Sequence, residues 1–246
     1  QPYKASKNMD RIITIETSTD LCSTALIEDG EVVCSMESGK DRSHASLTAV
    51  FIDEMLKERG CSAKDCSAVC VSDGPGSYTG LRVGVSSAKG LCFGADLPLL
   101  SVSTLEVLAV QAIMEGEQAD FIVPMRDARR MEVFAAVYSG TGELLENHTD
   151  SGLPHSDRAS AIIVEPDSFR DLLETGSVLF VGDGALKCRE VITHPNARFK
   201  ESSPRAASMA SLAVRELKAK RFKDVAYLEP FYLKDFVVTA SKKKLF

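Results

Sequence analysis

The feature that most constrains the fold is an order of predicted elements that the chain uses twice. In the first half, the dipeptide Asp29-Gly30 suits a tight hairpin turn between two runs of strand-forming residues. The predicted strands of this half are residues 11–16, 23–28, 31–36, 68–72 and 97–101, and the predicted helices are 43–60, 81–93 and 104–114. The order is therefore β-β-β-α-β-α-β-α.

The second half repeats this order in a reduced form. Its predicted strands are residues 121–124, 132–138, 143–147 and 178–182, its predicted helices are 167–174, 185–191 and 207–218, and its fifth strand is weak or missing. The duplicated order resembles the actin, Hsp70 and sugar-kinase superfold, and it predicts an α/β chain of two related domains that meet at a cleft. Kinases, ATPases and scaffolds share this superfold, so the fold alone does not decide the function.

The domain boundaries follow from this reading. We expect residues 1–10 to be a loose terminus or a remnant of expression, 11–103 to form the N-terminal domain, and 104–246 to form the C-terminal domain with a tail. Seven cysteines, an odd number, and no hydrophobic leader predict reduced thiols and a cytoplasmic location. No run approaches the roughly 20 apolar residues of a membrane span, so we expect no membrane association.

A net charge of −6 argues against a broad surface that tracks nucleic-acid phosphates. Two local basic groups remain as candidates for RNA contact, namely Arg126 with Arg129 and Arg130, and Lys242 to Lys244 in the tail. A solvated charged face is the favoured interpretation of both.

A glycine-rich turn, Asp73-Gly74-Pro75-Gly76-Ser77-Tyr78-Thr79-Gly80, lies between a predicted buried strand and a helix. Such a turn needs close backbone approach or positive φ at its glycines. Ser77 and Thr79 are placed to cap the helix, whose first N–H groups favour an anion. Gly74, Gly76, Ser77, Thr79 and Gly80 are therefore candidate anion or nucleotide ligands, and a plain connection is the alternative.

The longer string from Ser72 to Gly84 closely resembles the signature of the TsaB family, and several other segments agree with it. These are Ile13 to Ser18, Arg42 to His44, Asp127 to Val133, and Pro230-Phe231-Tyr232-Leu233-Lys234, in which Lys replaces the family's Arg. Residues 147–199 match nothing distinctive. The resemblance implies a non-catalytic partner of the paralogue TsaD in making threonylcarbamoyladenosine at position 37 of tRNA. It also implies a TsaE-like ATPase as a further partner, tRNA contact only through the complex, and a homodimer when the chain is alone.

The residues themselves lack the parts of an enzyme. Metal binding by a TsaD-like transferase needs two histidines four apart on a helix, and the position four after His44 is Thr48. The acidic turns at Glu16 and Asp127 lack the glycines that phosphate approach requires. We therefore expect no catalytic residue, no metal and no cofactor. A kinase or ATPase using Glu16 and Asp127, with Val181 to Gly184 under an adenosine, stays open as an alternative, and so does a peptidase using Ser77.

Two helices are the candidate partner surface. Gly80, Gly84 and Ala88 recur at intervals of four and allow close helix approach, although interior glycine costs about 1 kcal/mol. The preceding helix has a wide apolar stripe that includes Leu47, Phe51 and Met55, and Leu91 completes the predicted interface set. The alternative is that both helices simply cover their own sheet.

Overall fold

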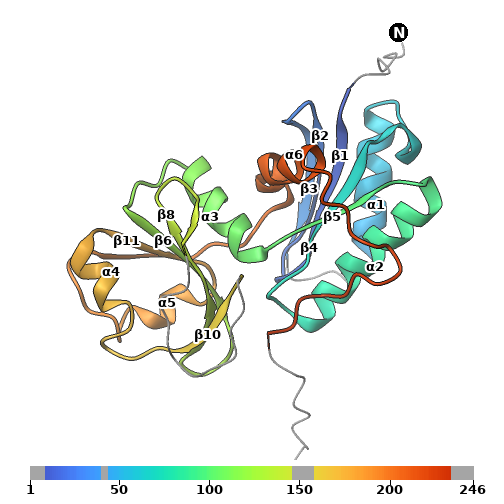
Figure 1. The fold of residues 1–246 in the computed structure, drawn as a ribbon. Helices are drawn as coiled ribbons and strands as arrows, with labels where there is room; N and C mark the ends of the chain where they lie inside the picture. Colours follow the sequence, from blue (N-terminus) through green and yellow to red (C-terminus); the bar gives the residue numbers. More distant parts are fainter. Residues whose placement is uncertain (1–8, 40–43, 146–157, 234–246) are drawn as a thin grey trace, which may run out of the picture.

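The computed structural model describes residues 9–39, 44–145 and 158–233 and contains two sheets placed side by side (Figure 1). The first sheet has the strand order β3-β2-β1-β4-β5. Its strands are β1 (Arg11–Glu16), β2 (Cys22–Glu28), β3 (Glu31–Ser38), β4 (Ala68–Ser72) and β5 (Leu99–Val102). The neighbours β2 and β3 are antiparallel, whereas β4 and β5 run parallel to β1. These five strands confirm the order predicted for the first half.

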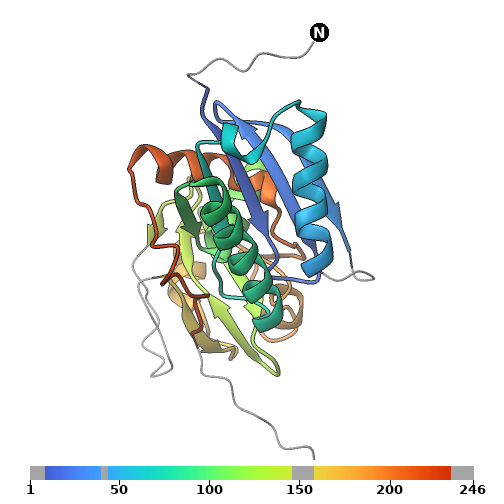
Figure 2. The ribbon, with the colours of Figure 1, turned by 90° about the vertical axis from the view of Figure 1, so that its right-hand side faces the viewer.

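Helices cover both faces of the first sheet. The helices α1 (His44–Glu58) and α2 (Tyr78–Ala95) lie side by side on one face (Figure 2), where they pack on Ile13 and Ile15. A short 3-10 helix, η1 (Ala63–Asp65), follows α1. Because side chains of a strand alternate between faces, Ile12 points to the opposite core. The Ser43 cap predicted for α1 lies outside the described residues.

The second sheet repeats this topology with broken strands. Its main order is β10-β7-β6-β11-β12, and β8 pairs with β6 and β9. The strands are β6 (Phe121–Asp127), β7 (Glu132–Ala135), β8 (Val137–Ser139), β9 (Leu144–Leu145), β10 (Ser160–Ile163), β11 (Val178–Val181) and β12 (Ala197–Lys200). The strands β11 and β12 run parallel to the central strand β6, as β4 and β5 run parallel to β1 in the first sheet. The chain has the duplicated actin, Hsp70 and sugar-kinase architecture.

Three expectations for the second half need correction. The strand predicted over 132–138 is interrupted at Ala136, because β7 pairs with the end of β6 and β8 pairs with its beginning. The missing fifth strand exists as β12, a short edge strand whose alternating charged residues hide its strand character. The strand β10 was not predicted.

Each sheet and the strands and helices next to it in sequence form one unit, and the last helix of each unit packs on the sheet of the other. The helix α3 (Thr104–Met114) follows β5 but packs mainly on the second sheet, whereas η2 (Ala206–Met209) and α6 (Ala210–Lys218) follow β12 and pack on the first. The helices α4 (Arg170–Thr175) and α5 (Ala185–Cys188) lie on the other face of the second sheet. The expected boundaries of 11–103 and 104–246 therefore separate α6 from the sheet that it covers, and a division into domains stays a proposal.

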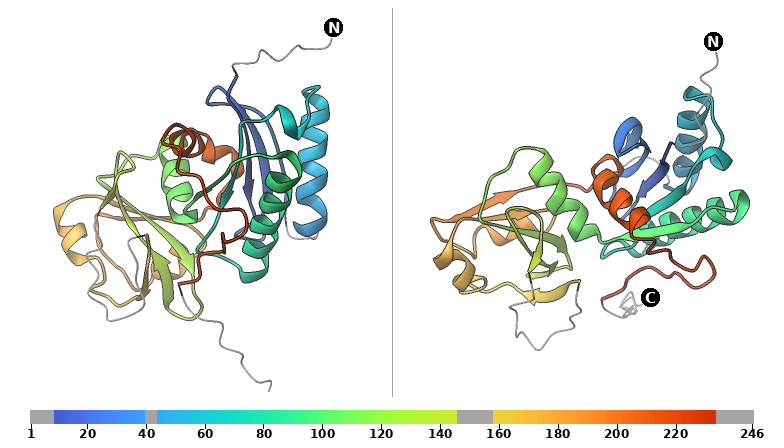
Figure 3. Two further views of the ribbon diagram at one scale, coloured as in Figure 1. Left: turned by 45° about the vertical axis from the view of Figure 1, so that its right-hand side comes forward. Right: turned by 45° about the horizontal axis from the view of Figure 1, so that its top comes forward.

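The segment that follows α6, residues 219–233, forms a strap along α2 (Figure 3). Lys223 N–H bonds to the Leu99 carbonyl at 2.8 Å, and Lys89 Nζ donates to the carbonyls of Ala226 and Leu228 at 3.0 and 3.1 Å. Val225 and Leu228 pack against the first core. The strap thus protects the edge strand β5.

All seven cysteines are free thiols. Within the described ranges, no helix is both long enough and apolar enough to cross a membrane.

Candidate functional site

The glycine turn connects β4 to α2 as predicted, and Ser77 caps the helix. The Gly80 N–H donates to Ser77 Oγ at 3.3 Å, while Thr79 is exposed in the first helical turn. Gly74 has φ of +126°, which favours glycine, and its carbonyl accepts from the Thr104 N–H at 2.9 Å. The peptide between Gly74 and Pro75 is cis. The turn therefore joins β4 to α2 and also holds the start of α3.

The glycines at 76, 80 and 84 face the chain's own loop after β1. A Cβ at Gly80 would overlap the Thr17 carbonyl oxygen, and a Cβ at Gly84 would overlap Thr17 Oγ1. At Gly76 a Cβ would lie 2.6 Å from that of Ser18. In return, Thr17 Oγ1 donates to the Gly80 carbonyl at 2.7 Å. Close approach of this loop is thus the physical reason for the three glycines.

This packing removes much of the support for an anion site at Gly74, Gly76, Ser77, Thr79 and Gly80. The Ser18 carbonyl already accepts the Ser77 N–H at 2.8 Å, at the helix end where an anion was predicted. The five residues do lie together around the turn. Anion binding at these residues stays a prediction. The Ser18 carbonyl occupies the position beside the Ser77 N–H that the anion would need.

Arg126 bridges the two units beside this turn. It belongs to β6, has only 5% of its surface exposed, and donates through Nη2 to the Ser18 carbonyl at 2.9 Å. Its Nη1 lies 2.7 Å from Asp183 Oδ2. The proposed basic patch is therefore divided, because Arg126 is buried while Arg129 and Arg130 are exposed. Lys242 to Lys244 lie outside the described residues.

The residues on which a kinase would depend are engaged in structural contacts. Burial raises the pKa of Glu16 and outweighs hydrogen bonds from Ser18 and Ser72. Burial also acts on Asp127, but hydrogen bonds from Lys187 and from the Arg129 N–H lower its pKa overall. The Asp183 carboxylate accepts from the Asp127 N–H at 3.0 Å in addition to Arg126. Within the described residues, no cluster of three or more acidic, histidine or cysteine side chains has the geometry of a metal site.

A serine hydrolase would require a base beside Ser77. His194 is the histidine whose side chain the structure describes, and its Nδ1 accepts from the Asn196 N–H at 3.2 Å in the loop before β12. The side chains of His44, His148 and His155 lie outside the described residues. Ser77 Oγ is used as a helix cap.

The strap also contacts the glycine turn, through Phe231 and Tyr232. The Phe231 N–H donates to the Asp73 carbonyl at 2.7 Å, and Arg158 Nη2 pairs with Asp73 Oδ1 at 2.5 Å while its guanidinium lies over the Phe231 ring. Tyr232 stacks on Tyr78 with ring centroids 4.6 Å apart. The closing motif predicted from the sequence is thus a structural clasp, and its Lys234 lies outside the described residues.

Most of the predicted partner interface is turned toward the chain's own sheet. Met55 is fully buried, and Leu47 and Phe51 have 8% and 9% of their surface exposed. Gly80, Gly84 and Ala88 are also buried on the sheet side of α2. The alternative interpretation describes these six residues better, because their side chains or Cα atoms already have partners within the chain. Leu91 alone of the predicted set borders an open surface.

An apolar groove with a volume of about 750 Å³ lies on the outer side of α1 and α2. Ile52 and Leu56 form its floor from α1, and Gly90, Leu91 and Gly94 form the opposite wall. Asp53 and Lys57 form an ion pair of 2.6 Å at its rim. Apart from the adjoining stretch of α2 itself, no atom lies within 4 Å of a Cβ placed at Gly90 or Gly94, so these glycines leave the groove open. The four-residue interval between Gly90 and Gly94 is a sequence signal that could have indicated this face.

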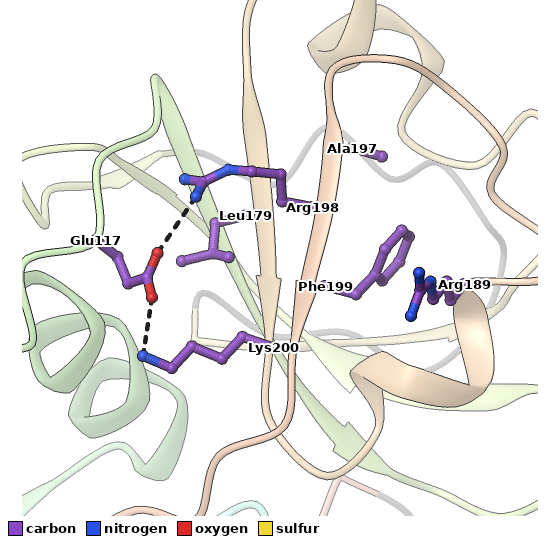
Figure 4. A pocket seen from close by; sticks show the side chains of 7 residues that line it. All are labelled: Glu117, Leu179, Arg189, Ala197, Arg198, Phe199 and Lys200. Atoms are coloured by element: carbon purple, nitrogen blue, oxygen red, sulfur yellow. Dashed lines mark hydrogen bonds and ion pairs between the residues drawn. The ribbon is translucent and has the colours of Figure 1, made fainter.

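A second hollow, of about 470 Å³, lies against β12 (Figure 4). Glu117 accepts there from both Arg198, at 3.3 Å, and Lys200, at 2.9 Å. Arg198 and Lys200 are therefore paired with a carboxylate that lines the same hollow.

Comparison with known proteins places the chain in a family. Residues 38–242 match the family described as "TsaD: tRNA N6-adenosine threonylcarbamoyltransferase". A Haemophilus influenzae protein described as "tRNA threonylcarbamoyladenosine biosynthesis protein TsaB" is 32% identical over 233 residues, which are 92% of this chain and 94% of that protein. The chain belongs to the TsaB family. The resemblance inferred from the glycine turn is thereby confirmed.

Two further proteins are similar to this chain over nearly its whole length. The Escherichia coli protein of the same description is 29% identical over 92% of this chain and 96% of its own length. A solved structure titled "YeaZ from Pseudomonas aeruginosa" superposes with a TM-score of 0.75 at 25% identity, covering 91% of this chain and all of that one. The whole two-sheet arrangement is therefore shared within the family.

Proposed function

We propose that this TsaB-family chain is a non-catalytic scaffold subunit that supports a TsaD-like transferase in threonylcarbamoylation of tRNA adenosine 37. Membership of a family whose named relatives are threonylcarbamoyladenosine biosynthesis proteins supports the reaction. The open groove between α1 and α2 is the observation that carries the scaffold role.

The groove has the composition of a protein interface. Its floor is apolar and its rim holds charged residues, as in the core and rim of protein contacts. Phe93, on the adjoining turn of α2, has 86% of its surface exposed, and Val50 on α1 has 47%. An exposed apolar surface of this kind favours a macromolecular partner. The partner that we propose is the TsaD-like subunit, and a second copy of this chain would compete for the same surface when the subunit is absent.

The absence of independent catalysis is the second part of the proposal. Loop 17–18 is bonded to α2 on one side and to Arg126 on the other, which leaves the phosphate approach of a kinase occupied by protein groups. A TsaE-like ATPase and the transferase would then consume the small substrates, and tRNA would be held through the complex.

An active kinase of the same superfold is the competing function, favoured only by the presence of Glu16 and Asp127. It requires magnesium-dependent ATP turnover by the isolated chain that Asp127→Asn abolishes. We expect no turnover above the level of a heat-treated sample.

The docking test uses Gly90, one of the two glycines that line the groove. Gly90→Arg fills the groove, and Gly90→Ala is the matched control, since both substitutions enter open space on a helix. The chain is mixed with the TsaD homologue of its own organism, and the mass of the complex is measured by light scattering. We expect a heterocomplex with the native chain and with Gly90→Ala, and at least a tenfold weaker one with Gly90→Arg.

Failure of the native chain to form any complex, or equal assembly by Gly90→Arg, would overturn the docking proposal. The melting temperature of each variant is measured in parallel, so that loss of folding is distinguished from loss of docking. Transferase activity of the mixture, with and without the chain, then tests the supporting role.

A further inference from the structure

The turn between β6 and β7 holds two adjacent arginines in an unusual backbone conformation. Arg129 and Arg130 have φ angles of +74° and +51°, a region that residues other than glycine, asparagine and aspartate seldom occupy. Residues held in such conformations collect at functional sites, where surrounding contacts keep them in place.

The surrounding contacts fix the turn firmly. Lys187 Nζ donates to the carbonyls of Arg130 and Glu132 at 2.8 and 2.6 Å and also pairs with Asp127. The Arg129 N–H donates to Asp127 Oδ1 at 2.8 Å. Lys187 of α5 therefore bonds to both strands of the β6–β7 hairpin next to its turn. These bonds fix the backbone that carries the two arginines.

Their charges are not neutralised by the described part of the chain. Both side chains are exposed, and within the described residues neither has a hydrogen bond, an ion pair or a ring contact. Two acidic neighbours are already engaged, because Asp127 pairs with Lys187 and Asp183 pairs with Arg126. By contrast, Arg11, Arg158 and Arg215 pair with carboxylates.

We propose that the Arg129–Arg130 turn binds the phosphodiester backbone of RNA, an inference that rests on the proposed role in tRNA modification. Guanidinium groups match phosphate oxygens with paired N–H donors, so two adjacent arginines suit adjacent phosphates. Because the chain as a whole carries a charge of −6, the contact is local. It adds affinity without reading sequence.

The test measures binding of an unmodified tRNA transcript to the complex of this chain with its TsaD homologue, over a series of salt concentrations. Each phosphate contact contributes a slope of roughly 0.7 to 0.9 to the dependence of log K on log salt. Arg129→Ala with Arg130→Ala should lower the slope by about 1.4 to 1.8 and weaken binding by at least tenfold at low salt. Arg170→Ala with Arg189→Ala, which removes two exposed arginines elsewhere in the second unit, is the matched control.

A second double variant separates the charge from the turn. Arg129→Asn with Arg130→Gly places residues that tolerate positive φ, so the melting temperature should be retained or raised while RNA binding falls as in the alanine pair. Arg129→Lys with Arg130→Lys should keep most of the salt slope. Unchanged binding in the alanine and Asn-Gly pairs, or an equal loss in the Arg170 and Arg189 control, would overturn the inference.

The two proposals fail separately. If no heterocomplex forms, the docking proposal is lost, and the same variants are titrated with the transcript on the chain alone. If the complex forms normally with the alanine pair and binds RNA with native affinity and slope, only the inference about the turn is lost.

Discussion

Arg126 of the second sheet donates a 2.9 Å hydrogen bond from Nη2 to the carbonyl oxygen of Ser18, which follows the central strand of the first sheet. The same carbonyl accepts from Ser77 at the start of α2. One backbone oxygen thus receives donors from both units.

Replacement of this bridge should weaken the whole molecule. Arg126→Ala removes a charged donor to Ser18 and the partner of Asp183, and we expect the free energy of unfolding in urea to fall by about 1–3 kcal/mol. Arg126→Met keeps most of the volume and isolates the contribution of the hydrogen bonds. A loss no larger than that of Arg170→Ala, about 0.5 kcal/mol or less, would contradict the bridging role.

The glycines of α2 should respond in opposite directions. Gly80→Ala forces a Cβ against the Thr17 carbonyl and should cost about 1–3 kcal/mol or more. Gly90→Ala enters open space on the same helix and should stabilise by about 0.5–1 kcal/mol, because alanine loses less backbone entropy. Urea unfolding of the two variants compares them directly. The same sign for both would show that the two sides of α2 are not distinguished as described.

Glu28 should carry a large share of the stability of the first unit. Arg11 bonds to its Oε1 at 2.6 Å and Arg59 to its Oε2 at 2.9 Å, and Arg11 and Glu28 are buried. Glu28→Gln leaves the Arg11 guanidinium without its counter-charge and should cost about 3–5 kcal/mol at pH 7.

The pH dependence of this cluster has a definite sign. Burial raises the pKa of Glu28, but hydrogen bonds from Arg11 and Arg59 lower it overall. A lowered pKa stabilises the folded state above the ordinary value of about 4.3, and this contribution is lost as pH falls through the folded pKa. The difference between native protein and Glu28→Gln should therefore shrink below about pH 4, as measured by thermal unfolding. A difference that is constant with pH would contradict the ion pair.

Glu16 should show the reverse behaviour. Burial raises its pKa, so the folded state favours the protonated form and loses stability as pH rises from the ordinary value of about 4.3 toward the folded pKa. Glu16→Gln keeps an oxygen for the Ser18 N–H, which donates to Glu16 Oε1 at 2.6 Å, and removes the ionisation. The variant should gain stability relative to the native protein as pH rises above about 4.3. Parallel stability curves would show that Glu16 does not titrate in this range.

Local sequence signals predicted the first unit well because its elements are regular and continuous. The strand Arg11–Glu16 and the helix Thr104–Met114 begin and end as predicted. The second unit was harder, since a break at Ala136 and the edge strand Ala197–Lys200 depend on pairing partners that no local pattern reveals.

The candidate site was predicted in part. Small residues at Gly80, Gly84 and Ala88 indicate close packing, but the sequence does not say whether the neighbour is the chain's own loop or another protein. The groove at Gly90 and Gly94 has the same spacing on the other side of α2. The bridge from Arg126 to Ser18 joins residues more than one hundred positions apart, and no short-range signal predicts it.

The exchange of final helices has a consequence for synthesis of the protein. The first sheet is complete once β5 has been made, but η2 and α6, which cover one of its faces, come about one hundred residues later, or roughly 5–20 s at ordinary translation rates. During that interval the apolar side chains of Ile12, Ala25 and Ile27 lack their helical cover. The nascent first half therefore leaves the ribosome with an open hydrophobic side, and its folding is completed only near the end of translation.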